Sequence, residues 1–208
     1  MKRIGILFMT LLLAAIAAVS VGCNIPKLEV SSVQGENYDF SSSAQSSKAP
    51  ADKKSSAQSS QTDAKAYTMA DIKALKNTER FAKNTLEHIF DGTINGKGKA
   101  TGYHYTKVSD SKGKIIDGTR SDADENGVFT GKVEVSGVKK NGFSSFYPES
   151  WTPQQVVDAI NTAYDDALSD KSNPHGSIWI GYCGDLEIDM YLNSDKKITT
   201  AFPVYEGD

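Results

Sequence analysis

The sequence has only two cysteines, Cys23 and Cys183, among its 208 residues. So small a number excludes the disulfide framework that supports many small exported domains. The fold must therefore rest on a hydrophobic core, and we expect Cys183 to be a buried strand residue.

The chain also lacks an excess of basic residues. The part from Tyr67 to Asp208 has 16 basic and 21 acidic residues, a net charge of −5, which is poor for an indiscriminate nucleic-acid binder. Five lysines nevertheless cluster near two histidines: Lys97, Lys99, Lys107, Lys112 and Lys114. We expect a local cationic cleft that holds a few phosphates, with modest and salt-sensitive binding.

A recognisable set of metal ligands is missing as well. The aspartates in the middle of the chain do not have the spacing of a calcium loop: Asp91, Asp117, Asp122 and Asp124. The sequence therefore predicts no metal site and no required cofactor.

The first 22 residues have the pattern of an export signal. Lys2 and Arg3 precede an apolar stretch over 4–19, and Ser20-Val21-Gly22 leads into Cys23. This pattern predicts a lipoprotein signal peptide over 1–22, with Cys23 acylated as the new N-terminus. The alternative is an uncleaved anchor, because 4–21 reaches the lower limit of a transmembrane span. Both readings place the rest outside the cytoplasm, and we expect a lipid anchor on the extracytoplasmic face.

Apolar residues are scarce between the signal and the folded part. The stretch 23–66 is rich in Ser, Ala and Gln, and Ser-Ser-Ala-Gln-Ser-Ser occurs at 42–47 and again at 55–60. Too little apolar surface is present to offset chain entropy. We therefore predict a disordered tether over 23–66 and one domain over 67–208.

The domain begins with a helical pattern. Thr68-Met-Ala-Asp71 resembles a capping box, and apolar residues follow at roughly helical spacing as far as Ile89, with an expected break near Asn84. His88 would lie at a helix end. The short β-rich runs 103–108, 114–116 and 128–135 come next, which would place His104 on a strand.

A second helix and three strands are predicted after residue 150. Thr152-Pro-Gln-Gln155 combines a capping residue with proline at the first helical position, and an apolar face follows over 156–167. The runs 177–183, 185–192 and 196–204 read as strands, and 186–192 alternates as a half-buried antiparallel strand does. Helices followed by a run of strands indicate an α+β fold.

His88 and His104 lie 16 positions apart at the edges of a run rich in Gly and Lys. Histidine is the side chain that gives and takes protons near neutral pH, so this pair fits proton transfer on an anionic substrate, of which RNA is the obvious candidate. Each histidine taken alone could be an ordinary surface residue. His175, in Ser172-Asn-Pro-His-Gly, fits an exposed turn.

Three regions together resemble the bacterial EndoU endoribonuclease family, and more distantly the animal EndoU enzymes and the coronavirus uridylate-specific endoribonuclease. They are the stretch 86–105, the segment 139–148 with Trp151 and the helix 154–161, and the ending 199–203. The resemblance runs from about Thr85 to the C-terminus. It implies a barnase/EndoU/RelE-like fold, with N-terminal helices packed on a curved antiparallel sheet.

The resemblance also implies an activity. Members cleave single-stranded RNA 3′ of uridine through attack of the ribose 2′-hydroxyl, which leaves a 2′,3′-cyclic phosphate, in metal-free or manganese-stimulated reactions. By this resemblance, His104 would be the base and His88 the acid, Lys140 would face the phosphate, and Thr200 would be a catalytic or substrate-contacting threonine. Ser144 would read the uracil, and Phe202, which replaces a tyrosine of relatives, would pack on it.

Several alternatives stay open at this point. Lys139 could take the place of Lys140, and Ser144, Ser145 and Phe146 could be a loop whose aromatic fills the core. Trp151 and Phe129 suit packing better than base stacking. The whole chain could be an exported RNA-cleaving toxin with an immunity protein, a secreted RNA-degrading enzyme, a lipoprotein that binds RNA or another polyanion without cutting it, or a surface adhesin. We expect a monomer whose partners are RNA and, through the lipid, the membrane.

Overall fold

The computed structural model describes residues 66–207. The expected signal peptide, Cys23 and the tether up to residue 65 lie outside the described residues. No helix within 66–207 is both long enough and apolar enough to cross a membrane. The elements are α1 (Met69–Lys73), α2 (Thr85–Phe90), β1 (Thr93–Ile94), β2 (Ala100–Thr101), β3 (Gly113–Ile115), β4 (Phe129–Val135), β5 (Val138–Phe146), α3 (Pro153–Ser169), β6 (Trp179–Cys183), β7 (Leu186–Leu192) and β8 (Ile198–Pro203).

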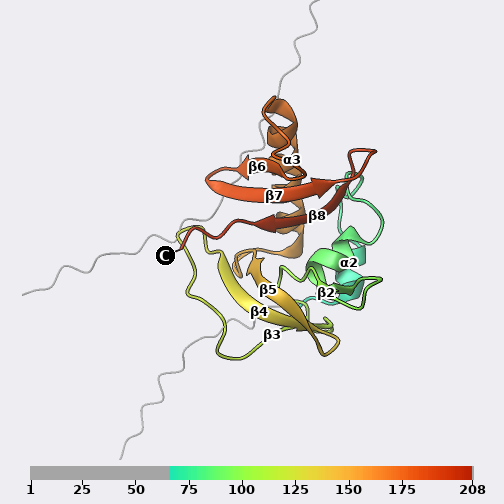
Figure 1. Cartoon of the computed structure of the whole chain (residues 1–208), viewed down its shortest axis with the longest axis vertical. Helices are drawn as coiled ribbons and strands as arrows, with labels where there is room; N and C mark the ends of the chain where they lie inside the picture. Colours follow the sequence, from blue (N-terminus) through green and yellow to red (C-terminus); the bar gives the residue numbers. More distant parts are fainter. Residues whose placement is uncertain (1–65, 208) are drawn as a thin grey trace, which may run out of the picture.

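The chain has a mixed α+β architecture, as predicted. Its strands form one two-stranded and two three-stranded antiparallel sheets, in the orders β1-β2, β3-β4-β5 and β6-β7-β8. Figure 1 shows the β6–β8 sheet above the β3–β5 sheet, with α2 at the right-hand side between them. The described residues thus form several small antiparallel sheets and one principal helix, α3, which lies in the second half of the chain.

The N-terminal helices are shorter than the apolar pattern suggested. Thr68 and Asp71 form the predicted capping box, but α1 ends at Lys73. Helix α2 then starts afresh after Asn84, whose left-handed backbone (φ 68°) breaks the helical path at the predicted place. The spacing of apolar residues was misleading because Phe81 reaches the core from a non-helical segment, where it bridges Ile198.

Helix α3 is held by the signals that the sequence displays. Thr152 and Gln155 form a reciprocal capping box, and Pro153 occupies the first turn, where no backbone donor is needed. The helix buries its apolar face mainly against β6. Gly181 allows this close approach, because a Cβ there would lie 1.9 Å from the carbonyl oxygen of Ala163.

The three closing strands were predicted to within two residues at each end. In β7 the side chains of Leu186, Ile188 and Met190 are buried, in the predicted alternation. They belong to the larger of two apolar clusters, which also includes the buried face of α3 and Cys183 on β6. The smaller cluster lies on the β3–β5 sheet and is centred on Phe129, Val133 and Phe146.

Two predictions about the middle of the chain were wrong. The run 103–108 is not a strand, because Gly102 and Tyr103 both have positive φ values (75° and 63°), and His104 lies outside any strand as a result. Conversely, 138–146 is the nine-residue strand β5, which had not been predicted, and residues 144–146, considered as a loop, are its last three residues. Its polar composition hid it, since Ser144 and Phe146 point inward while the residues around Gly142 are exposed.

Candidate active site

An open pocket of about 350 Å³ lies where α2, β2, β5 and β8 approach one another. Most of the residues nominated from the sequence meet in this pocket, although they lie far apart along the chain. Its lining consists of His88, Thr101, Gly102, His104, Lys140, Phe143, Ser145, Thr200 and Phe202. The fold therefore brings together two imidazoles, an ammonium group and two aromatic rings.

His104 is fixed at the base of the pocket by its own backbone. Its N–H donates to the carbonyl of Ile89 in α2 (2.7 Å), and its carbonyl accepts from the N–H of Tyr147, just after β5 (2.9 Å). The segment can lie this close to α2 because residue 102 is glycine: a Cβ there would come within 2.1 Å of the carbonyl oxygen of His88. Glycine at position 102 thus has a steric purpose, whereas an added Cβ at Gly96 or Gly98 would meet nothing within 4 Å.

The hydrogen bonds of His104 decide its tautomer. Nδ1 lies 2.8 Å from the backbone carbonyl oxygen of Ser145. A carbonyl only accepts, so Nδ1 carries a proton and Nε2 of the neutral ring is left with its lone pair. The ring is 5% exposed and stacks on Phe202, with centroids 5.4 Å apart. This is the state that a general base requires.

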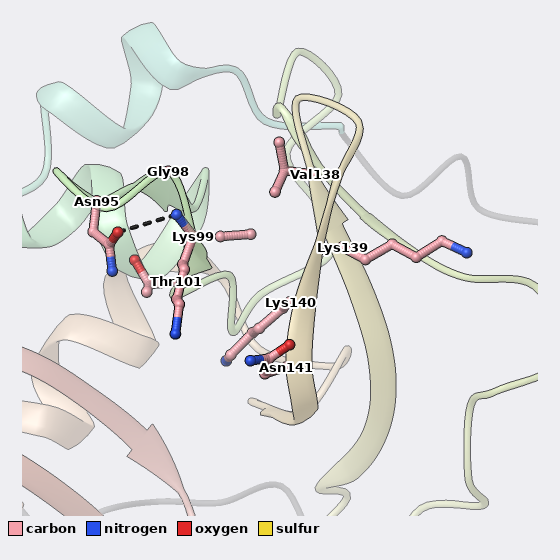
Figure 2. Close-up of a pocket in the computed structure, with 9 residues that line it drawn as sticks. Asn95, Gly98, Lys99, Thr101, Val138, Lys139, Lys140 and Asn141 are labelled. Carbon is pink, nitrogen blue, oxygen red and sulfur yellow. Dashed lines mark hydrogen bonds between the residues drawn. The ribbon is translucent and has the colours of Figure 1, made fainter.

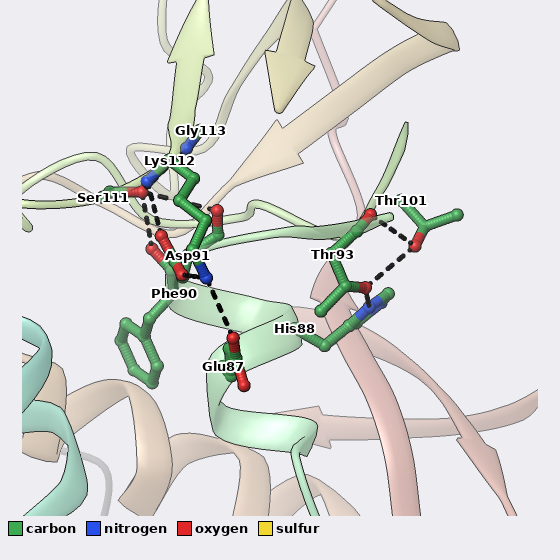
Figure 3. Close-up of polar contacts among 9 residues, drawn as sticks. All are labelled: Glu87, His88, Phe90, Asp91, Thr93, Thr101, Ser111, Lys112 and Gly113. Atoms are coloured by element: carbon green, nitrogen blue, oxygen red, sulfur yellow. Dashed lines mark hydrogen bonds and ion pairs between the residues drawn. The ribbon is translucent and has the colours of Figure 1, made fainter. Parts of the chain in front are cut away.

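His88 lies across the pocket, with its ring centroid 6.4 Å from that of His104. Its Nδ1 is 3.0 Å from the hydroxyl of Thr93 (Figure 3). The Thr93 hydroxyl lies 3.1 Å from the hydroxyl of Thr101, and the Thr101 hydroxyl donates to the backbone carbonyl of Thr93. Only one arrangement puts a proton in each contact: His88 Nδ1–H donates to Thr93, and Thr93 donates to Thr101. Nε2 is then the nitrogen left for substrate.

Lys140 supplies the cation of the pocket. Its Nζ donates to the hydroxyl of Ser144 (2.7 Å) and to the carbonyl of Gly102 (3.3 Å). Both partners are neutral, so burial dominates and lowers the pKa of Lys140 to about 8. Lys139, the alternative from the sequence, is exposed and points away from this region in Figure 2.

Ser144 and Ser145 occupy different positions. Ser144 is 1% exposed, and its hydroxyl accepts from Lys140 and donates to the carbonyl of Gly102 (3.2 Å), so it lies beneath the pocket. Ser145, the next residue on β5, lines the pocket. The residue nominated to read uracil is therefore engaged in holding Lys140.

Strand β8 contributes the far wall. Thr200 and Phe202 both line the pocket, and the Thr200 hydroxyl is buried without a hydrogen-bond partner among the described residues. An unpartnered buried hydroxyl is unusual and marks a group that a bound molecule can satisfy. Phe143, which the sequence reasoning missed, is 57% exposed and adds a second ring. The sequence carried no usable signal for it, because the strand that presents it, β5, was not predicted.

Both imidazoles are hard to protonate in the free protein. Burial, followed by the nearby charge of Lys140, lowers the pKa of His88 to about 4. The same two causes outweigh the Ser145 hydrogen bond and lower the pKa of His104 to about 3. An anion bound beside Lys140 would offset its charge and raise the pKa of His88, so substrate itself promotes the protonated form.

The cationic cluster expected from the sequence is divided in space. The ammonium of Lys112 pairs with Asp91 (2.7 Å) and Glu87 (3.0 Å), as Figure 3 shows, so its charge is neutralised away from the pocket. Lys97 and Lys99 lie on the β1–β2 turn and take no part in the ion pairs found within 66–207.

The other residues considered from the sequence lie outside the pocket. Trp151 and Phe129 are buried in the two cores, as predicted, and His175 lies in an exposed turn. Within the described part of the chain, no group of three or more His, Cys, Asp or Glu side chains is placed to hold a metal ion.

An α+β domain that brings two imidazoles and an ammonium group to one open pocket is suited to acid–base chemistry on an anionic substrate. The family model described as bacterial EndoU nuclease matches residues 82–205. This chain belongs to that family, and its membership implies RNA endonuclease activity.

A protein named Toxin, from Bacillus cereus, is 42% identical over 135 residues, which make up 64% of this chain. The match spans only 24% of that relative's own length.

Proposed function

We propose that this nuclease cleaves single-stranded RNA at uridines by transesterification, in which the ribose 2′-hydroxyl attacks the adjacent phosphodiester. The observation that carries the proposal is the convergence of His88, His104 and Lys140 on one pocket, with Nε2 of each imidazole left for substrate. Two oppositely placed proton carriers are what an internal displacement at phosphorus needs.

In this reaction the 2′-oxygen bonds to phosphorus while its proton moves to Nε2 of His104. The bond from phosphorus to the 5′-oxygen breaks, and that oxygen takes a proton from Nε2 of protonated His88. The products are a 2′,3′-cyclic phosphate and a free 5′-hydroxyl. The ammonium of Lys140 faces the nonbridging oxygens, whose charge grows in the transition state, and therefore stabilises that state preferentially.

Recognition of uracil falls to the other lining residues. Phe202 and Phe143 offer ring faces, and stacking on one base contributes about 1–3 kcal/mol without selecting the base. Selection needs hydrogen bonds, for which Ser145 and Thr200 are the hydroxyls on the pocket wall. We assign Ser144 the positioning of Lys140. Accordingly, Ser145→Ala should reduce the preference for uridine over cytidine, and Ser144→Ala should slow both substrates equally.

The biological setting is proposed from the sequence and the relative. We propose an exported toxin, lipid-anchored through Cys23, with an immunity protein that blocks the pocket, and a barnase/EndoU/RelE-like fold.

Manganese stimulation is tested by adding the ion to the metal-free protein. Labelling of cells with an alkyne fatty acid tests the anchor: the intact chain should be labelled and Cys23→Ser should not, whereas equal labelling would refute acylation at that residue.

The proposed reaction is tested with a DNA oligonucleotide that contains a single ribouridine. The protein should cut it once, 3′ of that residue, and mass spectrometry should show a terminal 2′,3′-cyclic phosphate. The matched oligonucleotide with deoxyuridine has no 2′-hydroxyl and must stay intact. Cleavage of both, or a product with a linear phosphate from the outset, would contradict the mechanism.

A further inference from the structure

A second hollow of about 330 Å³ adjoins the active site. It lies between the β1–β2 turn and the first residues of β5, and it shares Thr101 and Lys140 with the first pocket. Figure 2 shows the side chains of Lys99, Lys140 and Asn141 directed toward the same space, whereas Lys139 extends to the opposite side. The two hollows are thus consecutive parts of one surface.

The chemistry of this second hollow is that of an anion site. None of its lining residues is acidic, and Lys99 has no carboxylate partner among residues 66–207. The amide oxygen of Asn95 accepts from the backbone N–H groups of Lys97 and Lys99 (2.9 and 3.1 Å), which shapes the turn. The Asn95 amide nitrogen is left as a donor, and Lys99 and Asn141 line the same hollow.

We propose that this hollow binds the phosphate that follows the scissile one on its 3′ side, in the same RNA strand. The direction follows from the site, because Thr101, which borders both hollows, is linked through Thr93 to His88. In the proposed reaction His88 stands beside the departing 5′-oxygen, and the nucleotide that carries this oxygen continues toward the 3′ end. The base-stacking residue Phe202 borders the first pocket alone.

This inference rests on the proposed function and adds a subsite to it. It explains how a domain with net negative charge can hold RNA in register: the two ammonium groups of Lys140 and Lys99 engage consecutive phosphates of the strand. Phosphate contacts position a nucleic acid without reading its sequence. The subsite should therefore act on any nucleotide that follows the uridine.

The test uses the single-ribouridine oligonucleotide with an uncharged methylphosphonate in place of one phosphate. Placed immediately 3′ of the scissile phosphate, this change should lower kcat/KM about 3- to 5-fold, the effect of losing one solvent-exposed charge contact. Lys99→Gln should lower kcat/KM on the unmodified substrate by the same factor and make the protein indifferent to the methylphosphonate. Lys97→Gln, on the same turn but outside the hollow, should behave as the unaltered protein does.

The outcomes separate the two proposals. If the unaltered protein does not cut at the ribouridine, the proposed function fails. If it cuts but the 3′ methylphosphonate has no effect, or if Lys99→Gln and the methylphosphonate lower the rate independently of each other, the subsite is refuted while the reaction stands. Loss only when the methylphosphonate lies 5′ of the uridine would likewise overturn the assigned direction.

Discussion

At the scale of single residues, the chemistry of the site depends on which imidazole nitrogens already have a hydrogen-bond partner within the protein. A backbone carbonyl only accepts, so the contact with Ser145 assigns a proton to Nδ1 of His104. The hydroxyl chain from His88 through Thr93 to Thr101 also ends at a carbonyl, which assigns a proton to Nδ1 of His88. His104 is thereby kept ready to accept at Nε2, while His88 can deliver from Nε2 once protonated. None of this is visible in the spacing of the two histidines.

The hydroxyl chain behind His88 makes Thr93 a positioning residue. Thr93→Val keeps the shape and removes the hydroxyl, so His88 loses the acceptor that orients its ring. We expect kcat to fall about 10-fold with little change in KM, the effect of one lost hydrogen bond of about 1 to 1.5 kcal/mol. Thr130→Val on β4 is the control and should leave kcat unchanged. A rise in KM with kcat unchanged would contradict the assigned role.

The depressed pKa of His104 has a consequence for stability. Its folded-state pKa of about 3 lies below the unfolded value of 6.5, so the unfolded chain binds the proton more readily as pH falls through 6.5. Stability that is present above pH 6.5 is therefore lost in acid, by about 2 kcal/mol between pH 7 and pH 5. The free energies of unfolding of the protein and of His104→Asn, measured with urea, should differ at pH 7 and approach each other toward pH 5. A difference that does not change with pH would contradict this.

At the scale of elements, much of the fold follows from local signals. The capping boxes of α1 and α3, the alternation in β7 and the break before α2 are readable because each depends on neighbours in sequence. Strand β5 and the irregular backbone around His104 could not be predicted from local signals. Strand β5 is polar and has an exposed bend. The backbone around His104 depends on two positive φ angles and on backbone hydrogen bonds to α2 and to the chain after β5.

The contact of α3 with β6 offers a test at this scale. Gly181→Ala would push a methyl group into the carbonyl of Ala163, which is backbone and cannot rotate away. We expect a loss of about 1–3 kcal/mol in the free energy of unfolding, measured with urea. Gly96→Ala is the matched control, because nothing lies within 4 Å of the added atom. An equal change in the free energy of unfolding for both substitutions would contradict this, because it would show that the contact with Ala163 is not the cause.

At the scale of the whole molecule, the site exists only when distant segments meet. His88 and His104 come from the first half of the domain, Lys140 from β5, and Thr200 and Phe202 from the last strand. The resemblance to a known family nominated these residues together, and all five line one pocket. It did not separate the positions of Ser144 and Ser145, nor did it find Thr93, Thr101 or Phe143, whose roles arise from the fold alone.

The overall charge sets the response to salt. The domain from 67 to 208 carries a net charge of −5, yet Lys99 and Lys140 stay unpaired with any carboxylate of the described chain. Two phosphate contacts predict that log kcat/KM falls with log salt concentration at a slope of roughly −1.4. Measurement of cleavage between low and physiological ionic strength checks this, and a rate indifferent to salt would contradict it.

The central claim, that His88 gives a proton to the departing oxygen, is tested most directly by an RNA in which sulfur replaces the bridging 5′-oxygen at the cleaved bond. A thiolate leaves without protonation, so His88→Ala should lose about 10²- to 10⁴-fold on the oxygen substrate and recover nearly the full rate on the sulfur substrate. His104→Ala should be slow on both. Equal impairment of His88→Ala on the two substrates would contradict the account.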